Sequence, residues 1–147
     1  MYTWNLKNLY LGLDDPKFIE DNAHLDDLIT QVNNHANSLS LENPGETLET
    51  FMKSYEEFNT LASRLSSFIF LTLATDVTNK AFNNASVVLR QKFLKVTLPS
   101  TLFEKFVGKI DDLTKVINSS SYLKEYEFIL SEIKNNSKYL LSEAEEV

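Results

Sequence analysis

The feature that most restricts the possible folds of this chain is a long run of apolar residues at alternating steps of three and four. The positions are Leu48, Phe51, Tyr55, Phe58, Ala62, Leu65, Ile69 and Thr72. This spacing places all of them on one face of an α-helix and is typical of helices that pack against a near-antiparallel neighbour. Residues beside this stripe are polar early, as at Lys53 and Glu57, and apolar late, as at Phe68 and Leu71. We therefore expect a helix that begins at the surface and ends buried on most sides.

A second helix is predicted before this one. Asp15 followed by Pro16 has the pattern of a helix start, with the aspartate as cap and the proline at the first helical position. Asn43-Pro44-Gly45 is a strong break between the two helices. The expected apolar stripe of the earlier helix is Phe18, Leu25, Leu28, Val32, Ala36 and Leu39.

Three further helical segments follow. Residues 74–78 form a turn in which Asp76 or Thr78 caps a third helix, and Pro99 is expected to kink or end that helix. The next segment has Gly108 as its weak point, and Ser119-Ser120-Ser121 provides a loop and a cap. Its apolar stripe is Leu102, Phe106, Ile110, Leu113 and Ile117, and that of the last full helix is Tyr122, Tyr126, Ile129 and Ile133.

These patterns predict an all-α fold: an antiparallel bundle of about four to five helices in which the second and third form a long central hairpin. No stretch alternates apolar and polar residues as a strand would. The 147 residues fit a single helical domain, residues 1–147, and a hydrophobic content of 43% is enough for a packed core. Only three glycines and three prolines are present, which argues against a turn-rich β fold.

The final residues, 140–147, contain Ser142 followed by Glu145, which is the pattern of a capping box. A helix of so few residues is not stable alone, because nucleation costs more than the few hydrogen bonds return. We therefore expect that the chain is the front part of a longer protein, truncated near residue 147.

The composition indicates in which compartment the protein works and which classes of partner it is not expected to bind. The chain has no cysteine, which suits a reducing compartment, and no apolar signal segment at its start, so we expect a cytoplasmic protein. The most apolar stretch, residues 65–74, is far shorter than the ~20 residues that span a membrane. A net charge of -7 and a pI near 4.8 oppose binding to nucleic acid.

Positive charge is concentrated in residues 80–110, where Glu104 is the only acid among six basic residues. One interpretation is a basic helix that lies beside acidic helices and forms solvated ion pairs of little energy. The other is a positive face for an anionic partner or for the carboxylate of a peptide.

The sequence offers no catalytic, cofactor-binding or metal-binding residue. His24 and His35, the only histidines, are about three helical turns apart and therefore ~16 Å from each other, so they cannot ligate one metal. We expect both to be polar surface residues. The pairs Asp14-Asp15 and Asp26-Asp27 are better explained by helix-start electrostatics than by a cation site. Glu56-Glu57 is expected to be a solvated face.

Several segments, in this order, resemble the opening region of bacterial oligoendopeptidase F and its thimet-oligopeptidase-like relatives, which are zinc metallopeptidases that cut short peptides. The segments are Trp4-Asn5-Leu6 with Leu9-Tyr10, Asp14-Asp15-Pro16, residues 64–76, residues 122–126 and residues 140–146. The resemblance implies a non-catalytic N-terminal helical domain that walls the substrate cleft and admits only short, unfolded peptides. The implied partners are the missing catalytic domain and, in the intact enzyme, oligopeptide substrates.

In that family the zinc ligands lie in a downstream His-Glu-x-x-His helix and a later glutamate, where the metal activates a water. None of these positions exists in this sequence, so the resemblance implies zinc only in the missing catalytic domain and an inactive chain on its own. The isolated chain is expected to expose an apolar patch where the catalytic domain would dock. Self-association of the isolated chain would cover this patch. The alternative is a self-contained helical module for protein interaction or dimerisation. A helical-bundle di-metal enzyme is disfavoured, because neither histidine belongs to a Glu-x-x-His motif.

Overall fold

The computed structural model describes the backbone of residues 6–145 and the side chains of residues 6–139, and all regular structure within this part is helical. This confirms the all-α class. The elements are η1 (Leu6–Asn8), α1 (Pro16–Asn37), α2 (Pro44–Thr75), α3 (Lys80–Leu94), α4 (Thr97–Lys109), α5 (Leu113–Asn118), α6 (Ser121–Glu125) and α7 (Glu127–Glu145). Trp4 and Asn5, which contribute to the family resemblance, lie outside the described residues.

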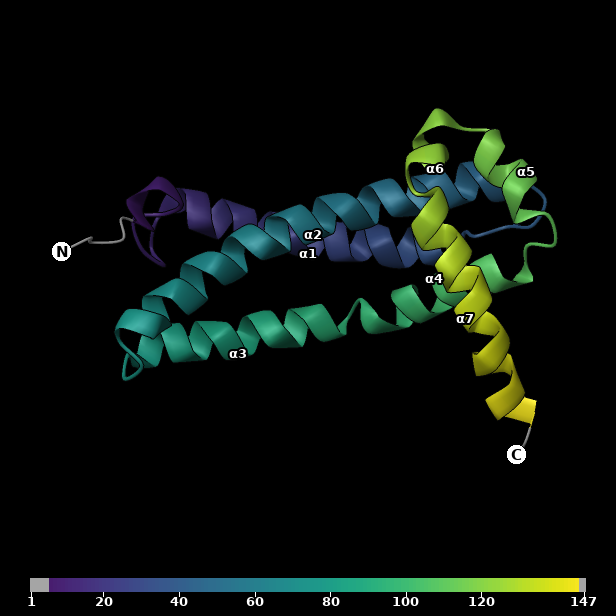
Figure 1. Ribbon diagram of the computed structural model, residues 1–147. Coiled ribbons are helices and arrows are strands. Elements are labelled where there is room, and N and C mark those ends of the chain that lie inside the picture. Colours follow the sequence, from purple (N-terminus) through teal and green to yellow (C-terminus); the bar gives the residue numbers. More distant parts are fainter. Residues whose placement is uncertain (1–5, 146–147) are drawn as a thin grey trace.

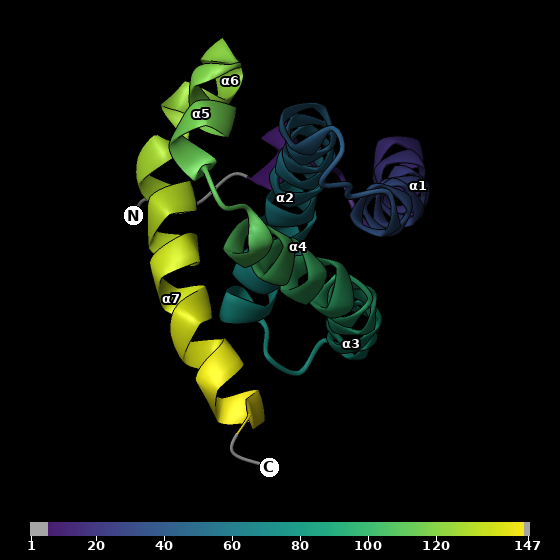
Figure 2. The same cartoon turned by 90° about the vertical axis from the view of Figure 1, so that its right-hand side faces the viewer.

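α1, α2 and the α3–α4 pair pack around a shared core as an elongated three-helix layer that is triangular when seen end-on (Figures 1 and 2). α1 and α2 run antiparallel along each other, and α3 and α4 follow one another back along α2 (Figure 1). α2 therefore makes a long hairpin with the α3–α4 pair. At the end of the layer where α2 begins, α5 and α6 lie beside α2 and α7 crosses α4 (Figures 1 and 2).

Local capping explains where the helices begin. The Asp15 carboxylate accepts a hydrogen bond from the Lys17 amide at the start of α1, and Pro16 occupies the first position, as predicted. Ser120 caps α6 through the Leu123 amide. The predicted caps of α3, Asp76 or Thr78, were wrong. Its N-cap is Asn79, whose side-chain oxygen accepts a hydrogen bond from the Phe82 amide. Asp76 instead accepts from the amide and hydroxyl of Thr78, which tightens the turn before Asn79.

The predicted apolar stripe of α2 is the centre of the main core. Phe51, Phe58, Leu65 and Ile69 are buried there against α1, α3 and α4. Aromatic rings fill the far end of this core, where Tyr10 packs edge-on against Phe18 and Phe68 with ring centroids 5.3 and 5.1 Å apart. Each buried side chain of this size contributes roughly 1.5–3 kcal/mol by leaving water.

The expectation that α2 ends buried on most sides was wrong. Phe70 and Leu71 remain 40% and 39% exposed near its C-terminus. The reason is geometric: α1 and α3 cover only the inner part of the circumference of α2, so its outer face stays open. The Arg90 guanidinium lies 5.7 Å from the centroid of the Phe70 ring and covers it only partly.

The chain from α3 to α5 is interrupted twice. α3 ends at Leu94, ahead of Pro99, which sits in the first turn of α4 where its missing amide hydrogen costs nothing. At this break Val96 is buried and the Lys95 carbonyl accepts a hydrogen bond from Asn33 of α1. The predicted stripe from Leu102 to Ile117 is shared between α4 and α5 rather than lying on one helix.

A second, smaller core joins the crossing helices at the end of the layer. Its members come from α2, α4, α5, α6 and α7 and from the segment between α4 and α5: Leu48, Phe106, Val107, Ile110, Leu113, Ile117, Leu123 and Leu130. Gly108 allows α4 and α7 to approach, because a Cβ atom there would lie 2.5 Å from Ser137 Oγ. The Lys134 ammonium donates to the Ile110 carbonyl across the same crossing.

The predicted new helix start at Ser142 was also wrong. α7 continues without interruption from Glu127 to Glu145, so Ser142 lies inside it. No glycine or proline stands between Asn135 and Leu141 to end the helix earlier, and a capping serine requires a non-helical backbone. None of the helices in the described part combines the length and the apolar character required for a membrane crossing.

Candidate binding groove

A hollow with both apolar and charged walls lies where α2 meets α4, α6 and α7. It is a cavity of about 720 Å³. Its walls combine aromatic, aliphatic and polar side chains: Phe51, Met52, Tyr55, Glu56, Asn59, Thr60, Ser63, Ser100, Phe103, Glu104, Tyr122, Tyr126, Ile129, Leu130 and Ile133. We refer to it below as the groove.

Aromatic rings form much of the groove wall. Phe51 stacks on Phe103 of α4 with centroids 4.8 Å apart and on Tyr55 with centroids 5.6 Å apart. On the opposite side, Tyr122 and Tyr126 lie 5.0 Å from each other in a tilted arrangement. Because Phe51 is fixed in the main core, one wall of the groove is held by the same stripe that organises α2.

Glu56 connects the two tyrosines to α2. The Tyr122 hydroxyl donates to Glu56 Oε2 at 3.0 Å. Burial and this hydrogen bond raise the pKa of Tyr122 well above its usual range. The hydrogen bond with Glu56 also raises the pKa of Tyr126. Both phenols therefore stay neutral donors at physiological pH, and the negative charge on this wall is that of Glu56.

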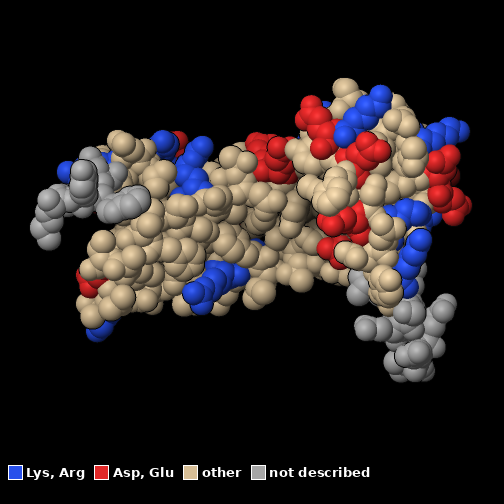
Figure 3. All heavy atoms as spheres, in the orientation of Figure 1, with Lys and Arg blue, Asp and Glu red and all other residues tan. Residues whose placement is uncertain are grey.

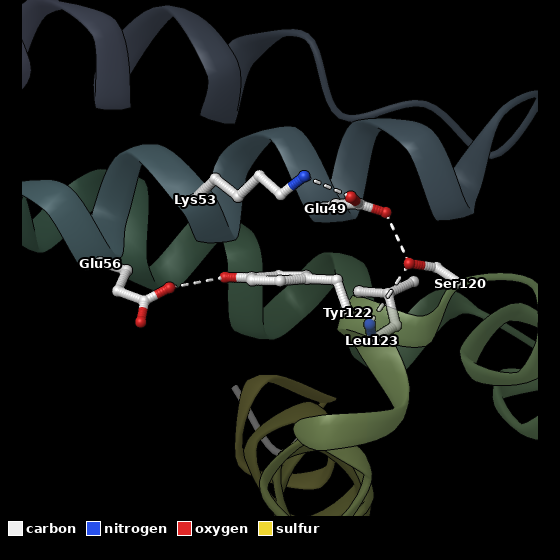
Figure 4. A network of polar contacts seen from close by, with 6 residues as sticks. All are labelled: Glu49, Lys53, Glu56, Ser120, Tyr122 and Leu123. Atoms are coloured by element: carbon white, nitrogen blue, oxygen red, sulfur yellow. Dashed lines mark hydrogen bonds and ion pairs between the residues drawn. The ribbon is translucent and has the colours of Figure 1, made fainter.

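A polar network fixes α6 against α2 behind the tyrosines (Figure 4). Glu49 accepts from the Lys53 ammonium at 2.5 Å and from the Ser120 hydroxyl at 2.6 Å, and these bonds, Lys53 first, lower the pKa of Glu49. Ser120 in turn caps α6. The Lys53 ammonium lies 5.1 Å from the centroid of the Tyr122 ring, so this ring already interacts with a cation.

The charge of the groove is negative. Glu56 and Glu104 are the only carboxylates among the described residues that line it, and these residues include no lysine, arginine or histidine. Acidic side chains gather where α2 meets α6 and α7, whereas the surface along the second half of α2 and α3 carries few charges (Figure 3). The cavity therefore combines an apolar wall with carboxylates, which suits a ligand that is both cationic and partly apolar.

The residues that the sequence singled out do not come together. His24 Nε2 lies 3.5 Å from Glu57 Oε1, whereas His35 Nδ1 lies 2.9 Å from the hydroxyl of buried Ser54. His35 is thus an interhelical contact of α1 with α2, not the plain surface residue expected. In the described part of the chain, no three histidine, aspartate or glutamate side chains are close enough together to hold a metal ion.

The residues of the two acidic pairs, Asp14-Asp15 and Asp26-Asp27, also do not form a common site. Asp15 is a helix cap, as the electrostatic interpretation predicted, while Asp14 is exposed. Asp26 lies in the middle of α1, so that interpretation was wrong for it, and its Oδ2 binds the Lys92 ammonium at 2.8 Å. This ion pair supports the simpler explanation of the basic segment, because it joins α3 to acidic α1.

Sequence reasoning missed the groove. Glu56 and Glu57 are exposed, as the expected solvated face requires, but Glu56 also lines the cavity and accepts from Tyr122, 66 residues away, which was not predicted. The one visible signal was the spacing of four between Tyr122 and Tyr126, which predicted a shared face. Nothing in the sequence indicated that this face would meet α2.

No protein-family model, curated protein sequence or solved structure matches this chain. The relationship to oligoendopeptidase F therefore stays a prediction from the sequence segments quoted above.

Proposed function

We propose that this chain is the non-catalytic N-terminal helical domain of an oligoendopeptidase F-like zinc metallopeptidase. In this role it walls the substrate cleft and limits access to short peptides. The observation that carries the proposal, beside the sequence resemblance, is the open apolar face along α2 and α3.

This face is made of large side chains that a self-sufficient core would cover. Val87, Arg90 and Leu94 recur along α3 at helical spacing, and Arg90 lies over Phe70 of α2, so the outer surfaces of these two helices are continuous. Leu94 is 71% exposed. The adjoining surface is mostly uncharged, apart from a basic patch midway along its length (Figure 3). Contiguous exposure of this kind marks an interaction surface.

The shape suits a steric role. Three long helical stretches pack around a shared core in an elongated arrangement that is triangular end-on (Figure 2), and such a core is expected to make it stiff. A stiff wall beside a catalytic domain excludes folded proteins by size and leaves room for an extended peptide. The cleavage chemistry would belong to zinc and its ligands in the catalytic domain, which this sequence does not contain.

Two measurements on the 147-residue chain test the proposal. We expect no stoichiometric zinc by metal analysis and no cleavage of a fluorogenic peptide. Robust cleavage that a chelator abolishes would overturn the assignment of a non-catalytic domain.

A genetic observation separates the proposal from its alternative. The DNA that follows codon 147 is expected to encode a His-Glu-x-x-His motif further downstream. A stop codon directly after codon 147 would contradict the proposal and favour a self-contained interaction or dimerisation module.

The same face makes the oligomeric state informative. We expect the isolated chain to self-associate through α3, and Leu94→Ser to weaken this association in sedimentation velocity. Leu41→Ser, at an exposed leucine outside α3, is the matched control. Equal effects of the two substitutions would show that the α3 face does not drive association.

A further inference from the structure

The groove has a chemistry that a purely steric wall does not require. We propose that it binds an arginine side chain within an extended peptide segment, with the neighbouring apolar side chains of that peptide against the aromatic and aliphatic wall. This inference goes beyond the proposed function, because it holds for the chain itself whether or not a catalytic domain follows.

Charge complementarity is the first observation. Glu56 and Glu104 both line the cavity, and no basic side chain among the described lining residues neutralises them. Glu104 makes no hydrogen bond or ion pair within the described part of the chain. A cation that enters the groove therefore meets an available carboxylate, whereas an anionic ligand is repelled.

The aromatic wall is the second observation. The Lys53 ammonium lies 5.1 Å from the centroid of the Tyr122 ring, which shows that this ring can take part in a cation–π contact. Tyr126 and Tyr55 add further rings to the cavity. A guanidinium group is planar, stacks on aromatic faces and forms paired hydrogen bonds to carboxylates, so arginine fits this wall better than lysine.

Size and depth are the third observation. A cavity of about 720 Å³ exceeds what one arginine side chain fills and lies within the common range of ~300–1,000 Å³ for ligand sites. Ile129, Leu130 and Ile133 provide an aliphatic strip from α7 beside the rings. The remaining space thus suits apolar side chains next to the arginine in the same peptide.

The test uses the 147-residue chain in zinc-free buffer. The probe is a fluorescein-labelled, end-blocked peptide with Phe-Arg-Leu at its centre. It is compared with two analogues in which citrulline or glutamate replaces the arginine. Citrulline keeps the shape and removes the charge, so its binding is expected to be about fivefold weaker by fluorescence anisotropy, and the glutamate peptide weaker still. No binding of the arginine peptide, or equal binding of the citrulline peptide, would overturn the inference.

Variants of the two groove carboxylates test whether the peptide binds in the groove. Glu104→Gln is expected to weaken binding of the arginine peptide about threefold, and the Glu56→Gln, Glu104→Gln double variant about tenfold. Glu20→Gln, at an exposed acid of α1, is the charge-matched control and is expected to leave the Kd unchanged. Far-UV circular dichroism and thermal melts verify that each variant is folded.

Two outcomes contradict the location. A loss with Glu20→Gln equal to that with Glu104→Gln would indicate attraction to the net negative charge of the whole protein. Unchanged tyrosine ring resonances of Tyr122 and Tyr126 in NMR titration would place the peptide elsewhere. Neither result bears on the downstream His-Glu-x-x-His motif, so this inference and the proposed function fail independently.

Discussion

The two ends of this molecule are held together in different ways. The layer of α1, α2 and α3 depends on one continuous apolar stripe and a cluster of aromatic rings, and ion pairs such as Asp26 with Lys92 link its helices at the surface. The end with α5, α6 and α7 has a smaller core and adds polar ties such as the Glu49, Ser120 and Lys53 network. The two ends therefore differ chiefly in the length of the apolar face that they bury: a long helix stripe organises the layer, whereas the short helices combine a smaller core with side-chain hydrogen bonds to α2.

The largest expected effect is in the layer core. Leu65→Ala removes a fully buried side chain from the middle of α2 and is expected to lower the free energy of unfolding by about 3 kcal/mol. Urea denaturation followed by circular dichroism measures it. Leu41→Ala, at an exposed leucine outside the α3 face, is the control. Similar losses for both would refute the view that the stripe organises the layer.

The next effect is at the crossing of α4 and α7. Gly108→Ala places a methyl group within 2.7 Å of Ser137 Cβ, closer than packed carbons tolerate. The net loss is expected to be about 1–2 kcal/mol, because strain outweighs the gain in helix propensity. Adding Ser137→Gly relieves the clash and restores part of the stability. A stabilising Gly108→Ala would show that the two helices are not tightly packed there.

A smaller effect on stability, which depends on pH, is expected at Tyr10 in the layer. The pKa of Tyr10 is raised from its ordinary value of 10.0, chiefly by burial and then by its hydrogen bond to Asp21. Its contribution to stability is complete below pH 10.0 and is lost as the pH rises above that value. Tyr10→Phe is expected to cost about 1 kcal/mol at neutral pH and to reduce the alkaline decline. An unchanged decline between pH 9 and 11, roughly one unit on each side of the ordinary value, would contradict this.

The smallest effect on stability is expected at Glu49, at the end of the molecule with α5, α6 and α7. The pKa of Glu49 lies below its ordinary value of 4.5 because of Lys53 and Ser120. Its contribution is complete above pH 4.5 and is lost as the pH falls through the lowered value. Glu49→Gln is expected to cost about 0.5 kcal/mol, since the pair is partly exposed and screened. Thermal melts at neutral and acidic pH measure it, with Glu20→Gln as control. A larger loss at acidic pH would reverse the sign and disprove the argument.

The comparison also shows what the sequence could predict. Asp15-Pro16, Asn43-Pro44 and the α2 stripe are local signals, so the boundaries and buried faces of α1 and α2 followed from them. The groove depends on contacts such as that between Glu56 and Tyr122, whose partners are far apart along the chain. Periodicity shows which face of a helix is apolar but not which neighbour it meets. The start of α3 was misplaced because Asp76 and Asn79 are both good capping residues, and only the turn geometry selects Asn79.

The short break between α3 and α4 has a mechanical consequence. A bare interruption between two helices acts as a hinge, but here Asn33 holds the Lys95 carbonyl and Val96 is buried against the layer. Flexing at this point would expose an apolar side chain and sever a tie to α1. The break is therefore expected to be stiffer than an unsupported interruption, because bending it would cost both contacts.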